Sequence, residues 1–275
     1  MKTKLASIAK IGFSAISLGV AAHALAAVPD SATFPAPLKA LTQRGVTVVG
    51  EPFKAGSGLT GWILQRQGHD MIVYTTADGK RLLAGSLLDE SGKDVTPGYT
   101  EQYLFPGLFK KLEASRFVAE GPAAPKSVVY AFMDPNCVYC HLSWKALQPY
   151  IKAGLQVRWV PVAFLKPTSV QRAAAILEAK SPVAALQQNE RSFVEQTEDG
   201  GLAPVEKPKD DTVQALSANR DLMQSFGSNG TPTLVWKDKN GVVHSKSGMP
   251  PLSALAEITG LPNQPQTDAE LEQFR

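Results

Sequence analysis

The feature that most constrains the fold is an apolar stretch that runs directly towards a pair of cysteines. Residues 127–133, SVVYAFM, form an apolar run of seven, which is typical of a strand buried on both faces of a sheet. Helical spacing follows from Cys137 to about Lys152, and residues 155–164, LQVRWVPVAF, have the composition of a second strand. This order predicts a β-α-β unit with a right-handed crossover.

The segment after this unit is predicted to be mostly helical before the chain returns to strands. Three helices are expected, at 169–180, from Ser181-Pro182 onwards and at about 212–226. Two short strands at 233–236 and 242–245 and a last helix at about 251–260 follow. We interpret residues 126–261 as one α/β domain with a helical insert at about 167–226. Residues 262–275 are polar and are expected to form a loose C-terminal tail.

The first part of the chain has a different pattern. Four segments have strand character, at 46–50, 61–67, 69–76 and 81–89, and Asp78-Gly79 predicts a tight hairpin between the last two. Residues 99–117 have helical spacing interrupted by Pro106-Gly107, and residues 119–126 have a linker-like composition. We therefore predict an N-terminal domain over residues 27–99 and a linker helix with a hinge over residues 100–125.

The N-terminus has the three parts of a secretory signal. A basic head with three lysines precedes the apolar residues 11–22, which are too few to span a bilayer, and Ala24-Leu25-Ala26 supplies small residues for cleavage. We predict that residues 1–26 are a signal peptide. The remaining chain has 25 basic and 25 acidic residues and no Lys/Arg run, so its charge gives no reason to expect a nucleic-acid partner.

The only two cysteines, Cys137 and Cys140, are three positions apart. An exported protein can keep disulfides, but a bridge that closes so short a loop constrains the unfolded chain very little. A structural zinc site needs four Cys or His ligands, and His69, His141 and His244 would have to converge from separate elements. We predict neither a metal nor a cofactor, and His69, alone in a strand, is assigned no role.

Residues 137–141, CVYCH, also match the C-x-x-C-H motif of haem attachment. The buried strand before the motif and the β-α-β unit around it favour a thioredoxin-type dithiol. Cys137 lies at the predicted helix start, where free N–H groups and the helix dipole stabilise a thiolate, whereas Cys140 lies one turn later on the buried face. This asymmetry predicts that Cys137 is the nucleophile and Cys140 the resolving thiol.

A second motif, Thr231-Pro232, precedes the expected strand 233–236. A proline that enters a buried strand removes a hydrogen-bond donor from the sheet, so this position requires a specific reason. After a β-α-β unit that carries C-x-x-C, we interpret the peptide bond before Pro232 as cis.

Taken together, the chain resembles the DsbC/DsbG family of periplasmic thiol:disulfide interchange proteins, and most closely its DsbG branch. The similar segments are residues 72–95, 134–154, 166–182 and 230–236. The resemblance implies an α+β, cystatin-like N-terminal dimerisation domain, a linker helix and an α/β, thioredoxin-like domain with a helical insertion. It also implies a periplasmic homodimer that acts on exported protein clients and is kept reduced by a membrane thiol reductant resembling DsbD.

The family's functional positions fall on Cys137 as nucleophile, Cys140 as resolving thiol and Thr231-Pro232 as the cis-proline loop. The backbone of Thr231 would pair with an extended client segment. Val138 and Tyr139 shape the helix start, and Val138 stands where DsbG-type motifs usually have proline, which puts the redox potential in doubt.

The sequence differs from related proteins in two further respects, a missing buried acid and a missing second disulfide. Ala131 stands where thioredoxins carry a buried acid, so proton transfer to and from Cys140 requires another group or water. His141 is the nearest titratable candidate, although an orientation towards solvent or a local capping role is the simpler expectation. The second, structural disulfide of DsbC-type proteins cannot form in a chain with two cysteines, which favours the DsbG branch.

The sequence therefore predicts a disulfide isomerase or reductase that acts on misoxidised or sulfenylated exported proteins and has chaperone activity. Three alternatives stay open at this point. They are a DsbA-like dithiol oxidase, a chaperone or binding module with secondary thiol chemistry and, more remotely, a c-type haem protein. The predicted N-terminal domain argues against the oxidase.

Overall fold

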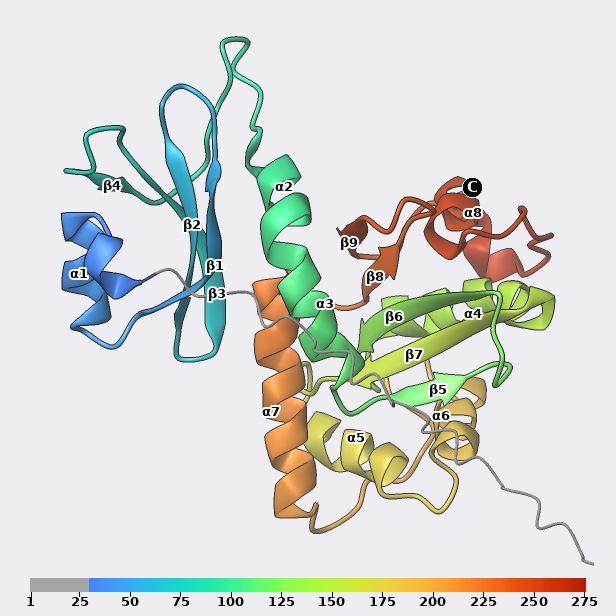
Figure 1. Cartoon of the computed structure of the whole chain (residues 1–275). Coiled ribbons are helices and arrows are strands. Elements are labelled where there is room, and N and C mark those ends of the chain that lie inside the picture. The colour runs from blue at the N-terminus through green and yellow to red at the C-terminus, as the bar shows by residue number, and fades with distance from the viewer. Residues whose placement is uncertain (1–29) are drawn as a thin grey trace, which may run out of the picture.

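The computed structural model describes residues 30–275, and the predicted signal peptide lies outside this range. The described chain contains two sheets, with strand orders β1-β2-β3-β4 and β5-β7-β6-β8-β9. In Figure 1 the helices α2, α3 and α7 lie between these sheets. No helix within residues 30–275 is long and apolar enough to cross a membrane.

The N-terminal sheet is an antiparallel meander covered by one short helix. Its elements are a 3₁₀ turn (Ser31–Thr33), α1 (Ala36–Thr42), β1 (Thr47–Lys54), β2 (Thr60–Arg66), β3 (His69–Thr75) and β4 (Leu82–Leu83). Gln67 and Gly68 join β2 to β3, and both have a positive φ, as a two-residue hairpin of this twist requires. Leu38 of α1 packs with Trp62 and Val73 in a small core of its own.

The predicted strand 81–89 is much shorter than expected. Only Leu82 and Leu83 pair with β3, and an isolated bridge joins Leu88 to Asp94 further on. The turn predicted at Asp78-Gly79 is present, since Gly79 has a φ of 65° and the N–H of Thr76 donates to the carbonyl of Arg81.

The linker helix runs through Pro106-Gly107 rather than breaking there. Its parts are α2 (Thr96–Tyr99), a π-helical turn (Thr100–Leu104) and α3 (Phe105–Glu113). A proline removes one helical hydrogen bond and its ring collides with the carbonyl four residues earlier. The wider π turn just before Pro106, in which the N–H of Phe105 donates to the carbonyl of Thr100, gives the ring room.

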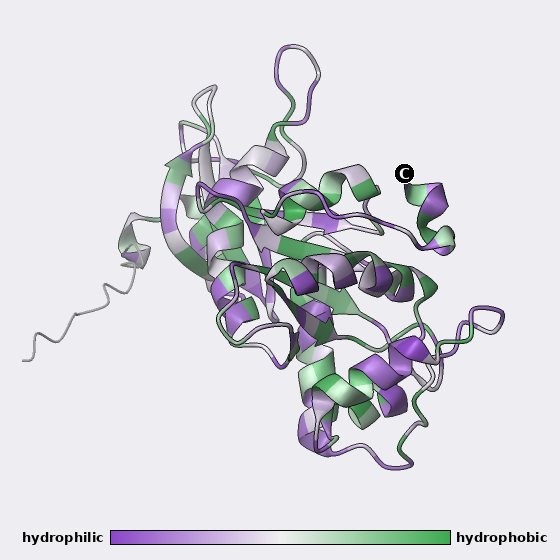
Figure 2. Ribbon diagram, turned by 90° about the vertical axis from the view of Figure 1, so that its right-hand side faces the viewer, coloured by the Kyte–Doolittle hydropathy of each residue, from purple (hydrophilic) through white to green (hydrophobic). Residues whose placement is uncertain are grey.

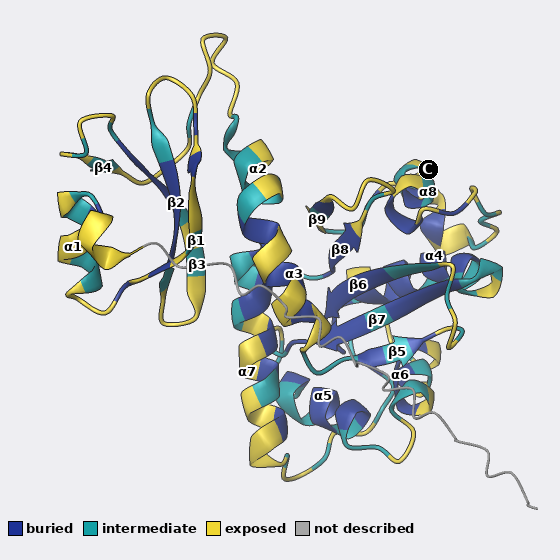
Figure 3. Cartoon of the chain, in the orientation of Figure 1, coloured by how far each residue is buried: buried dark blue, intermediate teal, exposed yellow. Residues whose placement is uncertain are grey.

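The second sheet contains the predicted β-α-β unit. β6 (Ser127–Met133) pairs in parallel with β7 (Leu155–Pro161), and α4 (Val138–Ala153) makes the crossover. β8 (Thr233–Lys237) and β9 (Val243–Ser247) extend the sheet in antiparallel fashion. Figure 3 shows that β6 and β7 are buried over most of their length, in agreement with the continuous apolar run.

The structure adds a strand that was not predicted. β5 (Val118–Glu120) lies partly in the segment expected to be a linker and pairs antiparallel with β7. It is too short for a periodic pattern to reveal it. The second sheet therefore begins at residue 118, before the predicted boundary at 126, and the division of the chain into separate domains stays a prediction.

The helical insert consists of α5 (Ser169–Leu177), α6 (Pro182–Arg191) and α7 (Asp210–Ser225). In Figure 2 the hydrophobic strands lie inside the molecule, and polar residues are prominent on the surrounding helices. α7 contacts both α3 and β3. One apolar cluster joins Ile63 of β2, Phe109 of α3 and Met223 of α7 to the second sheet, so the two sheets share buried surface.

The C-terminal tail is docked, which corrects the expectation of a loose segment. After the short elements Leu252–Ala254 and α8 (Leu255–Thr259), residues Ala269–Phe274 form a last 3₁₀ helix, η4. Its Leu271 is 1% exposed and belongs to the main core, and the ring of Phe274 meets that of Tyr139 edge-on. Two apolar residues in a polar segment form no periodic pattern, so the sequence did not indicate this contact.

We predict that Leu271→Ala lowers the free energy of unfolding by about 2–5 kcal/mol, because it opens a cavity in the main core. Denaturant unfolding followed by circular dichroism measures the change. Leu88→Ala is the control, because Leu88 is 58% exposed, and we expect a change within about 0.5 kcal/mol. Equal effects of the two substitutions would show that the tail is not docked.

Candidate functional site

The two motifs predicted from the sequence meet at the start of α4. Cys137 is the N-cap of this helix, with φ −92° and ψ 115°, and its Sγ accepts a hydrogen bond from the backbone N–H of Cys140 at 3.3 Å. The Cys137 thiol lies 3.3 Å from the carbonyl oxygen of Thr231 and donates to it. The Thr231-Pro232 peptide bond is cis. Both cysteines are free thiols in this structure.

The pKa values of the two thiols are shifted in opposite directions. Hydrogen bonding to the Cys140 side chain lowers the pKa of Cys137 below its usual value, although burial opposes this effect. Burial raises the pKa of Cys140 well above its usual value, and the hydrogen bond to Cys137 and the charge of Cys137 raise it further. Of the two thiols, Cys137 is therefore the one that ionises more readily.

A buried carboxylate fixes the loop that leads into Cys137. Asp134 is fully buried; its Oδ1 accepts from the N–H of Asn136 and from Ser169 Oγ, and its Oδ2 accepts from the N–H groups of Phe164 and Leu165. The N–H of Cys137 in turn donates to the Asp134 carbonyl at 3.0 Å. These bonds satisfy the carboxylate with neutral donors and fix the direction in which the helix begins.

Asn136 connects the same loop to the helical insert. Its side-chain amide donates to Ser169 Oγ at 3.0 Å, and its Oδ1 accepts from Arg172 and from the N–H of Gly200 at 3.2 Å. The amide of Asn189 on α6 donates to the carbonyl of Pro135 at 3.0 Å. The residues directly before Cys137 are thus bonded to the insert.

The cis-proline loop is held by a cluster of hydroxyl groups. Ser228 Oγ lies 2.8 Å from Ser247 Oγ, and Thr233 Oγ1 lies 2.7 Å from both Ser228 Oγ and the carbonyl oxygen of Gly230. Ser228 and Thr233 are buried. This cluster connects the ends of the loop to β9, so the Thr231 carbonyl that faces Cys137 has a defined position.

The expectation that His141 faces solvent is wrong. His141 is 7% exposed, its Nδ1 lies 3.2 Å from Oε2 of Glu190, and its ring stacks on that of Phe193 with centroids 4.8 Å apart. Glu190 is 1% exposed, and burial raises the pKa of its carboxyl group. Glu190 was not predicted from the sequence, because a glutamate on an amphipathic helix usually faces water.

A further buried acid, Glu120, lies at the end of β5. Its Oε2 accepts from the indole N–H groups of Trp144 and Trp159, at 3.1 and 3.0 Å, and its Oε1 accepts from Gln187 at 2.8 Å. Glu120 therefore joins β5 to α4, β7 and α6. Position 131, where thioredoxins carry a buried acid, is an alanine in this chain, and Ala131 is fully buried in β6.

Access to the thiol is narrow. Cys137 is 5% exposed and Cys140 is 1% exposed, whereas Tyr139 between them is 51% exposed and Val138 is partly buried. Cys137 therefore offers only a small opening to the sulfur of another molecule. Tyr139 stands at the surface two residues further along the chain, and its role in shaping the site stays a prediction.

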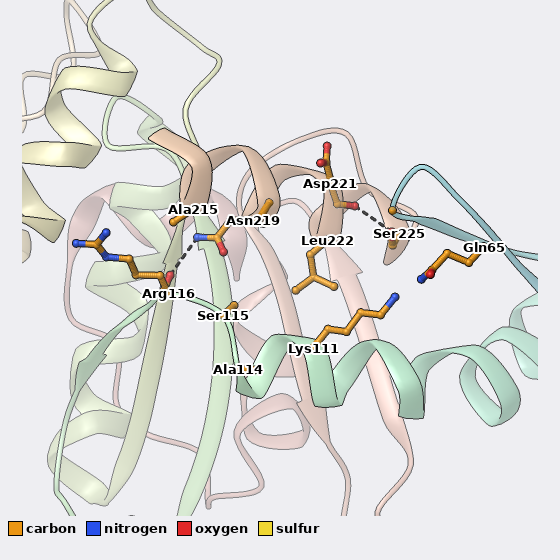
Figure 4. Close-up of a pocket in the computed structure, with 12 residues that line it drawn as sticks. Gln65, Lys111, Ala114, Ser115, Arg116, Ala215, Asn219, Asp221, Leu222 and Ser225 are labelled. Atoms are coloured by element: carbon orange, nitrogen blue, oxygen red, sulfur yellow. Dashed lines mark hydrogen bonds between the residues drawn. The ribbon is translucent and has the colours of Figure 1, made fainter. Parts of the chain in front are cut away.

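A separate cavity of about 570 Å³ lies away from this chemistry. Residues from the β2–β3 hairpin, the end of α3 and α7 line it, and neither cysteine is among them. Figure 4 shows Gln65 and Lys111 extending towards each other, and both donate to Asp70, at 2.7 and 2.5 Å. This cavity lies where the N-terminal sheet meets the linker helix and the insert.

A β-α-β unit, a C-x-x-C pair at the helix start and a cis-proline loop beside it define a thioredoxin-like thiol–disulfide oxidoreductase. The model of the thioredoxin-like domain family matches residues 118–260. The chain is also 34% identical over 231 residues to the thiol:disulfide interchange protein DsbG of Pseudomonas aeruginosa, a match that covers 82% of this chain and 88% of the relative.

DsbG of Escherichia coli is 30% identical over 244 residues, covering 86% of this chain and 95% of the relative, and DsbC of Haemophilus influenzae is 29% identical over 229 residues, covering 81% and 87%. A solved structure of Helicobacter pylori DsbG matches with a TM-score of 0.39 and 17% identity, covering 73% of this chain and 97% of that one. The chain belongs to the DsbG/DsbC family of thiol:disulfide interchange proteins.

We predict that Cys140→Ala raises the pKa of Cys137, because it removes the hydrogen bond that contributes most to lowering it. The rate of alkylation of the reduced protein by iodoacetamide, measured against pH, reports this pKa. The inflection should move to higher pH but stay below that of a free cysteine, because the backbone N–H of residue 140 still donates to the sulfur.

The matched control is Ser143→Ala, which removes a hydroxyl group on the same helix that bonds Met249 and not the cysteines. Its inflection should coincide with that of the unmodified chain. A Cys140→Ala inflection that does not move would mean that the two thiols are not hydrogen-bonded to each other.

Proposed function

We propose that this chain is a periplasmic isomerase and reductase of wrong disulfides in exported proteins, with Cys137 as nucleophile and Cys140 as resolving thiol. The single observation that carries the proposal is the position of Cys137, whose sulfur caps α4 beside the cis-proline loop while Cys140 lies buried one turn later. The similarity to DsbG and DsbC proteins over more than four-fifths of the chain supports it.

In the first step the Cys137 thiolate attacks one sulfur of a client disulfide. A new bond forms between Cys137 and that sulfur, the client S–S bond breaks, and the second client sulfur leaves as a thiolate. With a sulfenylated client, the same attack on the S–OH group gives the mixed disulfide, and the hydroxide that leaves becomes water when it takes up a proton. With a client disulfide, isomerisation is completed when another client thiolate attacks the client sulfur of the mixed disulfide, which forms a new client disulfide and releases Cys137 as a thiolate.

Resolution requires the thiolate of Cys140. Burial, the hydrogen bond to Cys137 and the charge of Cys137 all raise the pKa of Cys140. Once Cys137 is bonded to the client it carries no charge, so the last two causes disappear and the pKa of Cys140 falls. Cys140 can then attack Cys137, which releases the client thiolate and closes the Cys137–Cys140 disulfide. A membrane reductant resembling DsbD would return the pair to its thiols.

The client is held beside the cis-proline loop. The Thr231 carbonyl is 3.3 Å from the Cys137 sulfur, and Thr231 is partly exposed, so an extended client segment that pairs with this backbone would bring its own sulfur close to the nucleophile. The exposed ring of Tyr139 provides apolar contact area at the same opening.

We further propose a homodimer formed by a cystatin-like N-terminal domain, with chaperone activity in the space between the protomers. β1 is an edge strand of the first sheet, and the unpaired backbone groups of an edge strand can pair with a second copy. Val49 and Met71 add exposed apolar area to this sheet.

An oxidase that donates a disulfide is the alternative within the same chemistry. Acid-quenched alkylation of the protein in intact cells separates the two, since an isomerase or reductase is kept mostly as free thiols and an oxidase mostly as the closed disulfide. Loss of the free thiols when the membrane reductant is deleted would support the proposed partner.

We predict that Cys140→Ala accumulates clients as mixed disulfides on Cys137, because the resolving thiol is absent. Non-reducing electrophoresis of periplasmic extract should show adducts that disappear on reduction. The double variant Cys137→Ala, Cys140→Ala is the control and should show none. If Cys140→Ala gives no covalent adducts either, Cys137 does not act on protein disulfides.

We also predict that removal of residues 27–99 converts the dimer into a monomer with weakened isomerase activity, because it removes the proposed interface. Analytical ultracentrifugation measures the assembly, and reactivation of a scrambled disulfide protein measures the activity. A shortened chain that still sediments as a dimer would contradict the assignment of the interface.

A further inference from the structure

Three potential metal ligands from distant parts of the chain meet beside the redox helix. His141 follows Cys140 on α4, Glu195 comes shortly after α6, and Glu270 lies on η4. One ligand atom of each lies within 4.8 Å of the others, and this is the only such group among residues 30–275. The cluster therefore joins the redox helix, the helical insert and the C-terminal tail.

A buried carboxylate fixes the orientation of the His141 imidazole. Its Nδ1 lies 3.2 Å from Oε2 of the buried Glu190, and its side chain is 9% exposed. An Nδ1–H that donates to a carboxylate leaves the lone pair of Nε2 free, as is common for histidines that bind metal ions. No residue within the described range forms a hydrogen bond with Nε2 of His141.

The carboxylates around this cluster share one paired lysine among residues 30–275. Lys145 Nζ pairs with Glu270 at 2.5 Å and with Asp268 at 2.8 Å, so one cation already serves two carboxylates. Glu195 has no ion pair among residues 30–275 and lies close to Glu270. Two carboxylates this close repel each other unless a proton or a cation lies between them.

We propose that His141, Glu195 and Glu270 bind a divalent transition-metal ion of the zinc class. One imidazole nitrogen and two carboxylate oxygens are a ligand set that Zn²⁺ accepts, whereas Mg²⁺ and Ca²⁺ prefer oxygen ligands alone. Ligand atoms around a tetrahedral Zn²⁺ ion lie about 3.4 Å apart. The ligand atoms of the three residues lie within 4.8 Å of one another. Because Glu195 and Glu270 are exposed, rotation of their side chains can bring the carboxylate oxygens to the shorter separation.

The site is open on the side of the glutamates and closed on the side of His141. Three protein ligands leave a fourth position for water or for a group of another molecule. The bound ion would connect η4 and the segment after α6 to the first turn of α4, so it would stabilise the packing of the tail next to the redox pair. A metal site was not predicted from the sequence, because glutamates that are 75 residues apart show no ligand spacing and the cysteines and histidines alone are too few.

Zinc binding to the full-length chain in its oxidised form tests the proposal, because a closed Cys137–Cys140 disulfide cannot supply thiolate ligands. We expect isothermal titration to show one Zn²⁺ per chain, with at least tenfold weaker binding in Glu195→Gln, which removes one ligand without disturbing the core. Glu190→Gln should weaken binding about 10- to 100-fold through the orientation of His141.

Asp268→Asn is the matched control. It removes a neighbouring carboxylate that pairs with Lys145 but is not among the three ligands, so it should leave Zn²⁺ affinity unchanged within about twofold. Thermal unfolding with and without Zn²⁺ gives a second measurement, since an ion that binds only the folded chain raises the melting temperature. This rise should be lost in Glu195→Gln and kept in Asp268→Asn.

Three results would overturn the proposal. The first is no Zn²⁺ binding to the oxidised chain, and the second is binding that Glu195→Gln and Asp268→Asn weaken equally. The third is equally tight binding of Mg²⁺ or Ca²⁺, which would exclude a nitrogen ligand. None of these results depends on thiol chemistry, so they leave the proposed isomerase function untouched.

Discussion

The contacts of one sulfur atom determine most of what this molecule can do. Cys137 Sγ is held between the N–H of Cys140 and the carbonyl of Thr231, and these contacts require both the helix start and the cis-proline loop to be in place. The sheet order places β6, which leads to Cys137, next to β8, which follows Pro232. The fold thereby brings together two motifs that are 94 residues apart.

The parts of the fold with a strong local pattern could be predicted from the sequence. The apolar run 127–133 coincides with β6, and the helix begins directly after Cys137, because strand burial and helix capping are determined by neighbouring residues. The tail and β5 could not be predicted, since a single buried leucine and a strand of three residues leave no periodic signal. The placement of His141 depends on Glu190, which is 49 residues away and belongs to another helix.

The same limit applies to the other acids around α4. Asp134, Glu120 and Glu190 are almost completely buried, and each accepts hydrogen bonds from another part of the chain. In the sequence they are ordinary charged residues, and only the fold shows that they join β5, β7 and the helical insert to the redox helix. Asn136, directly before Cys137, is hydrogen-bonded to four residues of the insert, namely Thr168, Ser169, Arg172 and Gly200, so the insert supports the site.

Ala131 affects how Cys140 loses its proton. Where a thioredoxin would have a buried acid to remove the proton of the resolving thiol, this chain has a methyl group that is completely buried. In the proposed mechanism, deprotonation of Cys140 therefore depends on the fall of its pKa when Cys137 loses its negative charge to a client, while burial continues to oppose it. A resolving thiol that loses its proton with difficulty attacks more slowly, and in this mechanism that lengthens the life of the mixed disulfide. A long-lived mixed disulfide gives the client's own thiols time to exchange, which favours isomerisation over simple reduction.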